Sequence, residues 1–201
     1  QDVISGMYVN TSKENIQTTP YFDNPLENPR IKKLLELLDG LEEKTIIFCK
    51  YQQEINDITN IINQMYGKNK AVEYTGELSQ KKRQKNLDLF QTTSQYLIAN
   101  KQCGAYGLNL QFCSYIIFYS NDWDYGTRIQ AEDRVHRIGQ NENVHIVDIC
   151  ASDTLDERIL KCLDKKENLV DSIRCEIEEN KDKAYSWITK KKEDLYEDLY
   201  R

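Results

Sequence analysis

The residues best suited to chemistry lie together in one short stretch of the chain, Gln130-Ala-Glu-Asp-Arg-Val-His-Arg-Ile-Gly-Gln140. If this stretch is helical, Gln130, Arg134 and Arg137 stand at positions i, i+4 and i+7 and share one face. Two guanidinium groups held side by side suit a polyphosphate, because each planar fork can donate two hydrogen bonds to its oxygen atoms. A parallel apolar stripe would hold the helix against a sheet; it consists of Ala131, Val135 and Ile138.

The same spacing also fits a solvated surface helix whose arginines pair with Glu132 and Asp133. Such charge patterns are common on exposed helix faces, so the spacing alone favours neither a phosphate site nor a surface ion-pair network.

The elements that must position this stretch follow from hydrophobic periodicity. Short apolar runs predict buried strands, and they cover residues 45–49, 71–74, 96–99, 115–119 and 144–150. Runs with helical spacing lie between and after them, over residues 31–38, 55–65, 80–90, 127–138, 154–179 and 181–201. This alternation indicates an α/β fold with a parallel sheet covered on both faces. Ligands then bind beyond the carboxyl ends of the strands, after Cys49, Tyr74, Ala99 and Tyr119.

The first part of the chain is polar, contains all three prolines, and is predicted to be irregular. We expect residues 1–28 to form a linker or arm, residues 29–179 one globular lobe, and residues 180–201 a helical extension. The chain begins at Gln1 rather than Met, which suggests a fragment of a longer protein.

Composition narrows the functional classes. The net charge of −6, from 33 acidic and 27 basic residues, argues against a generally basic nucleic-acid coat but permits a local basic groove. The six cysteines lack the short C-x-x-C spacing of a zinc site, so we expect no metal, and Cys49 and Cys150 read as core residues. Without a run of about 18 apolar residues, no membrane span is predicted.

Residues 130–140 resemble motif VI of superfamily 2 helicases, in the form found in Swi/Snf-like DNA translocases. Further segments resemble the other motifs of that family in the same order, over about residues 29–170. They are Thr45–Cys49, Tyr74–Gly76, Cys103–Leu110, Tyr115–Trp123 and Thr154–Ile159.

The resemblance implies a RecA-like fold and the second motor lobe of an ATP-dependent DNA translocase or helicase. Arg134 and Arg137 would be arginine fingers, with Arg137 the direct contact to the γ-phosphate, and Gln130 would orient them or touch the nucleotide. Gly107 and Asn109 would shape the loop that couples nucleotide to DNA. The chain lacks a G-x-x-x-x-G-K-[ST] loop and an acidic magnesium box. ATP with Mg²⁺ would therefore be bound mainly by a first lobe, and this chain alone should not hydrolyse ATP.

The resemblance also implies a DNA-binding track that holds DNA mainly through its phosphates. The residues expected to form it are Thr75, Gly76, Asn100, Lys101 and Gly104. DNA, in duplex form, is the expected partner, in a cytoplasmic, nucleoid-associated protein of bacterial or viral source. Two alternatives stay open: a RecA-like docking module without catalysis, and a lobe directed to RNA. The chain departs from the family at the start of the motif V region, where Asn100, Lys101 and Ala105 stand in place of small hydroxyl residues and paired glycines. A basic cluster at Lys81, Lys82, Arg83 and Lys85 is more simply a solvated helix face.

Overall fold

A five-stranded parallel sheet forms the centre of the molecule, with strand order β4-β5-β3-β6-β7. The computed structural model describes residues 7–12, 15–20, 22–104, 110–135 and 143–165. The strands are β3 (Thr45–Cys49), β4 (Ala71–Tyr74), β5 (Tyr96–Asn100), β6 (Tyr115–Phe118) and β7 (His145–Asp148). The central strand β3 is buried along its whole length, as expected for a parallel sheet with helices on both faces. The predicted α/β architecture is confirmed.

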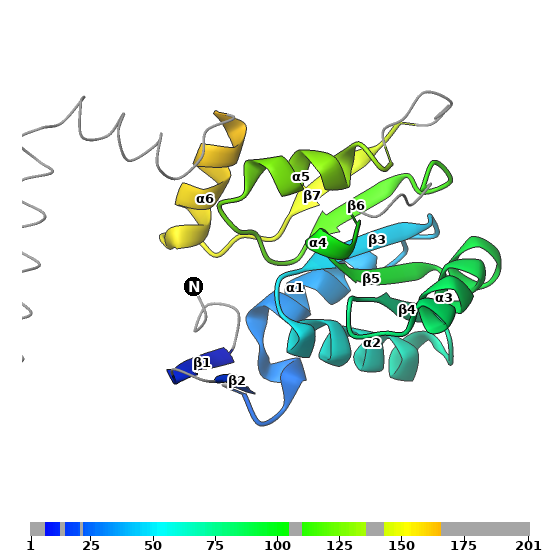
Figure 1. Ribbon diagram of the computed structural model, residues 1–201, viewed down its shortest axis with the longest axis horizontal. Coiled ribbons are helices and arrows are strands. Elements are labelled where there is room, and N and C mark those ends of the chain that lie inside the picture. The colour runs from blue at the N-terminus through cyan, green and yellow to red at the C-terminus, as the bar shows by residue number, and fades with distance from the viewer. Residues whose placement is uncertain (1–6, 13–14, 21, 105–109, 136–142, 166–201) are drawn as a thin grey trace, which may run out of the picture.

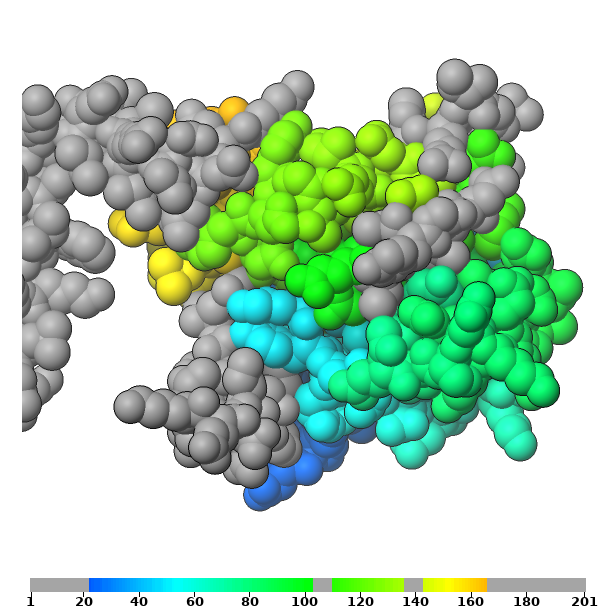
Figure 2. Space-filling view, in the orientation of Figure 1, coloured from blue at the N-terminus to red at the C-terminus, as the bar shows by residue number. Residues whose placement is uncertain are grey.

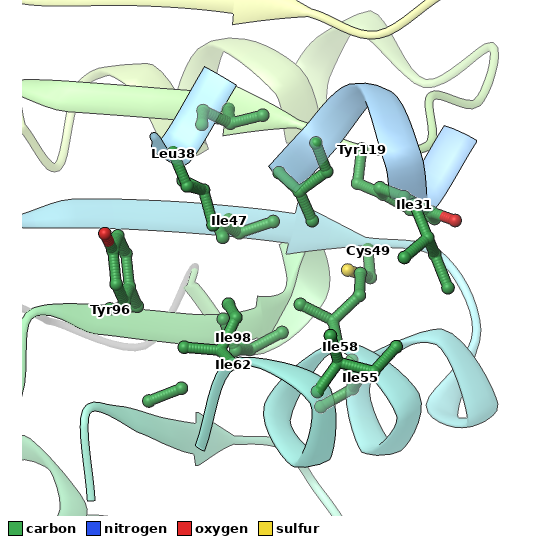
Figure 3. Packing of buried hydrophobic residues seen from close by; sticks show 14 of the residues in the cluster. Ile31, Leu38, Ile47, Cys49, Ile55, Ile58, Ile62, Tyr96, Ile98 and Tyr119 are labelled. Atoms are coloured by element: carbon green, nitrogen blue, oxygen red, sulfur yellow. The ribbon is translucent and has the colours of Figure 1, made fainter. Parts of the chain in front are cut away.

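Helices cover the two faces of this sheet (Figure 1). On one face, α1 (Pro29–Leu38) and α2 (Gln52–Tyr66) pack their apolar side chains against alternate residues of β3, β5 and β6, forming the core cluster of Figure 3. On the other face, α3 (Gln80–Thr92) and α5 (Tyr125–Glu132) close a second cluster. Successive strand residues point to opposite faces, so each strand feeds both clusters. The remaining helices are η1 (Pro25–Glu27), α4 (Lys101–Gly104) and α6 (Leu155–Asp164).

Local sequence signals explain where the first helix begins and ends. The side chain of Asn28 accepts a hydrogen bond from the backbone N–H of Arg30, and Pro29 occupies the first helical position. Both are typical of a helix start, because proline lacks the N–H that would be unsatisfied there. The helix ends at Leu38, and Gly40 then adopts a positive φ of 75°, a conformation that glycine adopts without steric cost.

The structure corrects several boundaries. Residues 1–28 were expected to be irregular, but β1 (Met7–Ser12) and β2 (Asn15–Pro20) form an antiparallel hairpin. The helix expected over residues 127–138 spans Tyr125–Glu132, and residues 133–135 form a turn. Cys49 is buried as expected, whereas Cys150 lies half-buried after β7. The expected helix beyond Asp164 lies largely outside the described residues, as does the extension over 180–201.

Within the described residues, no helix is long and apolar enough to cross a membrane. The same part of the chain contains no group of three or more His, Cys, Asp or Glu side chains placed to hold a metal ion.

Candidate functional site

The carboxyl ends of the strands meet at one edge of the sheet because the parallel register aligns them. Phe48 pairs with Ala99 of β5 and with Phe118 of β6, and Phe118 pairs with Asp148 of β7. Tyr74 of β4 pairs with the same Ala99. The segments that follow these residues therefore emerge side by side, where open α/β sheets bind their ligands.

Three of the residues expected to contact DNA lie together at this edge. Thr75 and Gly76 follow β4 directly, and Asn100 ends the neighbouring β5. Gly76 is exposed, whereas Thr75 is buried, and its hydroxyl has no hydrogen-bond partner among the described atoms. The Asn100 amide donates to the Lys50 carbonyl (3.2 Å) and accepts from the Gln102 N–H (2.9 Å). Asn100 thus fastens the end of β5 to the end of β3.

Lys101 occupies the same edge but does not present its ammonium group to solvent. Its side chain is only 2% exposed, and Nζ lies 3.0 Å from Oδ1 of Asp122. Burial lowers the pKa of the Lys101 ammonium, and the carboxylate of Asp122 opposes that shift. The side-chain charge of Lys101 is therefore held inside the protein, and a contact of Lys101 with nucleic acid would have to come from its backbone.

The helix α5 precedes the arginines of the sequence motif and is fixed at its start by Asp124. The Asp124 carboxylate accepts hydrogen bonds from the backbone N–H (3.0 Å) and the hydroxyl of Thr127. These bonds, the Thr127 hydroxyl first, lower the pKa of Asp124. A carboxylate at this position satisfies an unpaired helical N–H and meets the positive end of the helix dipole.

Arg128, in the middle of α5, makes the densest polar contacts near the site. Its guanidinium donates to both carboxylate oxygens of Asp148 (2.6 and 3.0 Å) and to the side-chain carbonyl of Asn121 (3.1 Å). It also pairs with Glu132, four residues later in the helix, and stacks 3.5 Å from the centre of the Phe118 ring. These contacts bind α5 to β7, to the end of β6 and to the loop between β6 and α5.

Of the three residues predicted to share a helical face, Gln130 is exposed on α5 and Arg134 lies past its end. The Val135 N–H donates to the Glu132 carbonyl (3.0 Å), and the Arg134 carbonyl accepts instead from the N–H of Leu110 (3.3 Å). Arg134 is half-buried, and Val135 is fully buried in the second core cluster. The turn at 133–135 therefore replaces the continuous helix that the spacing predicted.

Of the four other predicted residues, the structure describes one. Gly104 ends α4 at the sheet edge, close in sequence to Lys101. Gly107, Asn109 and Arg137 lie outside the described residues.

Beneath the edge, a buried carboxylate joins the ends of β3 and β6. Oε2 of Glu54 accepts hydrogen bonds from the Ser120 hydroxyl (2.7 Å) and from the backbone N–H groups of Lys50 and Tyr51 (3.1 Å each). The Ser120 hydroxyl also accepts a hydrogen bond from the Lys50 N–H (2.7 Å). The start of α2 is thereby held to the strand that leads into α5.

A second buried pair holds the other side of this edge. Arg30 of α1 pairs with Asp156 of α6 and donates to the carbonyls of Tyr119 (2.6 Å) and Ile149 (3.3 Å). These two carbonyls follow β6 and β7 directly, so one guanidinium connects two helices and two strand ends.

Neither of these buried pairs, nor the Arg128–Asp148 pair, is predicted by the sequence pattern. One signal was available: Asp148 is a charged residue inside an apolar strand run, which calls for a partner if the strand is buried. The partner's identity depends on which helix the topology places beside β7, and the sequence does not supply this.

The parallel sheet, its two helical layers and the loops at its carboxyl edge define a RecA-like α/β lobe. Residues 29–139 match the family described as "Helicase conserved C-terminal domain", and the chain belongs to that family. It is the second RecA-like lobe of a superfamily 2 helicase of the Swi/Snf-like group.

Several curated relatives carry the same region. The chain is 31% identical over 156 residues to "Uncharacterized ATP-dependent helicase YqhH" of Bacillus subtilis, covering 76% of this chain and 27% of that protein. It is 30% identical over 177 residues to "Putative ATP-dependent helicase/translocase YwqA" of the same organism, covering 85% of this chain and 18% of that protein. It therefore spans about a quarter or less of the length of these relatives.

Solved structures agree on the fold. The C-terminal part of the Fun30 ATPase domain superimposes with a TM-score of 0.64 at 24% identity, over 70% of this chain and 46% of that one. The C-terminal domain of the DEAD-box protein Dbp5 gives a TM-score of 0.58 at 20% identity, over 68% of this chain and 77% of that one.

Proposed function

We propose that this lobe is half of an ATP-driven DNA translocase and that it supplies the arginines that act on ATP. The observation that carries the proposal is the contact between the Leu110 N–H and the Arg134 carbonyl. It fastens the arginine segment, residues 130–140, at Arg134 to the chain that leads into β6. Arg134 is thus held against the body of the lobe, as a positioned arginine requires, rather than on a detached surface helix.

The chemical role follows from the guanidinium group. During phosphoryl transfer, negative charge spreads over the oxygens of the transferred group. A positioned arginine stabilises this charge and raises the reaction rate by a factor of about 10³–10⁵. Arg137 would make the direct contact with the γ-phosphate, Arg134 would support it, and Gln130 would orient the pair. Positioning matters because preorganised charge needs no rearrangement when the reaction occurs, and the contacts of Arg128 and Asp124 hold α5 in place for this purpose.

The nucleotide would contact this lobe through its phosphate oxygens. Guanidinium forks suit those oxygens, whereas the described residues offer no cluster of acidic ligands for Mg²⁺. We therefore assign Mg²⁺, which neutralises phosphate charge when bound, and most of the ATP contacts to a first lobe. That lobe would be supplied by the same polypeptide or by a partner, and the present chain alone would be inactive.

DNA would lie across the carboxyl edge and be held mainly through its phosphates. Gly76 is exposed there, and Asn100 and Gly104 lie beside it on the neighbouring segment. Thr75 and Lys101 would contribute through the backbone, because both side chains are buried. Curated relatives of this chain include "DNA repair protein RAD5" of Candida glabrata and "DNA repair and recombination protein RDH54" of Saccharomyces cerevisiae, and these names support DNA as the partner. We propose that this DNA is a duplex.

The proposed organisation has three parts. Residues 1–28 would be the arm from the first lobe, residues 29–179 the motor lobe, and residues 180–201 a helical extension. Such a motor would work where the DNA is. In a bacterium, that place is the cytoplasm and its nucleoid; for a viral protein, it is the cytoplasm of the host cell.

The experiment is to measure ATP turnover by the two-lobed protein with no nucleic acid, with duplex DNA, with single-stranded DNA and with RNA. The wild type and the Arg134→Ala and Arg137→Ala variants are compared. Arg158→Ala serves as the control, because Arg158 is an exposed arginine of α6 in the same lobe.

The proposal expects strong stimulation by duplex DNA that collapses in both finger variants and persists in Arg158→Ala. Turnover indifferent to nucleic acid and to both arginines would replace the motor with a docking module. Stimulation by RNA alone would assign the lobe to RNA.

A further inference from the structure

Two segments of the lobe contact each other at two places, one of them at the carboxyl edge of the sheet. One begins at Lys101, after β5, and ends at Leu110; the other begins at Asp122, before α5, and ends at Arg134. Lys101 Nζ meets Asp122 Oδ1 at 3.0 Å, and the Leu110 N–H meets the Arg134 carbonyl at 3.3 Å. The helix α4 contacts α5, and Figure 2 shows the described part of α4, in green, beside α5, in yellow-green.

We propose that Lys101 and Asp122 are positioning residues that transmit DNA occupancy at the end of β5 to the arginine segment. The inference rests on the proposed function and adds to it the side chains that connect the two sites. Neither residue is assigned a contact with ATP or a side-chain contact with DNA.

The burial of Lys101 makes the contact firm. An ammonium group that is 2% exposed has lost nearly all its water, and this is costly unless a counter-charge replaces it. Asp122, whose side chain is 30% exposed, provides that charge. Lys101 cannot leave Asp122 without either exposing itself or remaining buried and unpaired, so the two residues move together.

Asp122 passes the constraint directly to the start of α5. The same Oδ1 atom that meets Lys101 accepts a hydrogen bond from the backbone N–H of Asp124 (3.2 Å). Asp124 is the residue whose carboxylate caps α5. One carboxylate oxygen therefore links the first residue after β5 to the first turn of the helix that carries Gln130.

The loop between these contacts is itself held. Asn121, next to Asp122, donates to Asp148 (2.5 Å) and accepts from Arg128 (3.1 Å). A shift at Lys101 is thus passed to α5 as a unit rather than absorbed by a loose loop. Coupling between sites requires such a chain of packed and charged contacts with defined positions.

The test uses Lys101→Met, which keeps the length of the side chain and removes the charge, in the two-lobed protein. ATP turnover is titrated with duplex DNA, and DNA affinity is measured over a range of salt concentrations. Asp122→Asn tests the other partner more gently, and the double variant tests whether the two act through one contact. Lys33→Met is the matched control, because Lys33 forms an exposed pair with Glu36 on α1.

Each single variant should reduce the ratio of DNA-stimulated to unstimulated turnover by about 2- to 30-fold, the range typical of residues that couple two sites. The double variant should be no worse than the more affected single variant, because both remove one contact. The slope of log affinity against log salt should stay at the wild-type value, since no phosphate contact is lost. Lys33→Met should match the wild type in all three measurements.

An unchanged stimulation ratio in both single variants would overturn the inference while leaving the proposed motor intact. A salt slope reduced by about one would also overturn it, because Lys101 would then be a phosphate contact. Turnover that DNA does not stimulate in the wild type would overturn the proposed function and this inference together. If Lys101→Met does not fold, Asp122→Asn decides the outcome alone.

Discussion

Arg128 and Asp148 join α5 to the edge strand β7 through two parallel hydrogen bonds of 2.6 and 3.0 Å. The Arg128 side chain is 9% exposed and also lies over the Phe118 ring. A fork-to-fork pair of this kind fixes both distance and orientation. The position of the arginine segment relative to the sheet therefore depends on a residue outside the motif that identifies the family.

Replacing Arg128 with alanine should destabilise the lobe by about 3–5 kcal/mol, because Asp148 would keep a largely buried charge without its partner. Denaturant unfolding of the lobe measures this change. The control Arg158→Ala, at an exposed site, should change stability by about 0.5 kcal/mol or less. A loss below about 1 kcal/mol in Arg128→Ala would mean that the pair behaves like an exposed ion pair.

The sequence predicted the sheet well because the signals of buried strands and helices are local. The runs at 45–49 and 71–74 match β3 and β4 at both ends. Short apolar runs of this length are typical of buried strands and are too short for most helices. The arginine segment was predicted less well. Its helical spacing continues past Glu132, but the chain turns there, where Leu110 takes the Arg134 carbonyl and Val135 enters the core.

The polar contacts of the site were the least predictable part. Lys101 was expected from the sequence only to lie at the DNA edge, and its pairing with Asp122 depends on the packing of α4 against α5. The start of α5 could have been found, because aspartate, here Asp124, is one of the preferred N-cap residues. The expected helix began two residues late because this cap was not recognised.

Asp124→Ala should lower stability by about 1 kcal/mol, the usual cost of losing an N-cap side chain. Asp124→Asn keeps an oxygen that can accept from the Thr127 N–H and should lose less than half of that amount. Thermal or denaturant unfolding of the three proteins gives the comparison. Equal losses in the alanine and asparagine variants would show that the charge, rather than the hydrogen bond, supports the helix.

Glu54 should make stability fall as pH rises. Burial raises the pKa of Glu54, while hydrogen bonds from Ser120 and from the backbone of Tyr51 and Lys50, together with the charge of Arg30, oppose the shift. The folded state then binds the Glu54 proton more tightly than the unfolded state. Stability from this residue is thus fully present below the unfolded pKa of about 4.3 and is lost as pH rises through the raised value.

The Glu54→Gln variant lacks this titrating group. Above the unfolded pKa of about 4.3, the free energy of unfolding of the variant should therefore change less unfavourably with rising pH than that of the wild type. Subtracting the two unfolding profiles isolates the effect from the other carboxylates. Parallel profiles would show that Glu54 titrates alike in the folded and unfolded states.

The described cysteines should differ in reactivity towards a thiol reagent. Burial raises the pKa of Cys49 well above its ordinary value and that of Cys113 to about 12, so both lack thiolate and access. Cys150 is half-buried and should label first among Cys49, Cys113, Cys150 and Cys162 in the folded lobe. Mass spectrometry of labelled peptides tests the order, with the denatured lobe as the reference in which all four react. Fast labelling of Cys49 or Cys113 in the folded lobe would contradict their burial.

The most direct test of the central claim is to measure kcat and ATP affinity separately for Arg137→Ala in the two-lobed protein with saturating duplex DNA. A finger that acts on the transition state should lower kcat by about 10³–10⁵ and change ATP affinity by less than about tenfold, because its contact strengthens as charge develops. A kcat within about tenfold of the wild type would contradict the account and remove Arg137 from the chemistry.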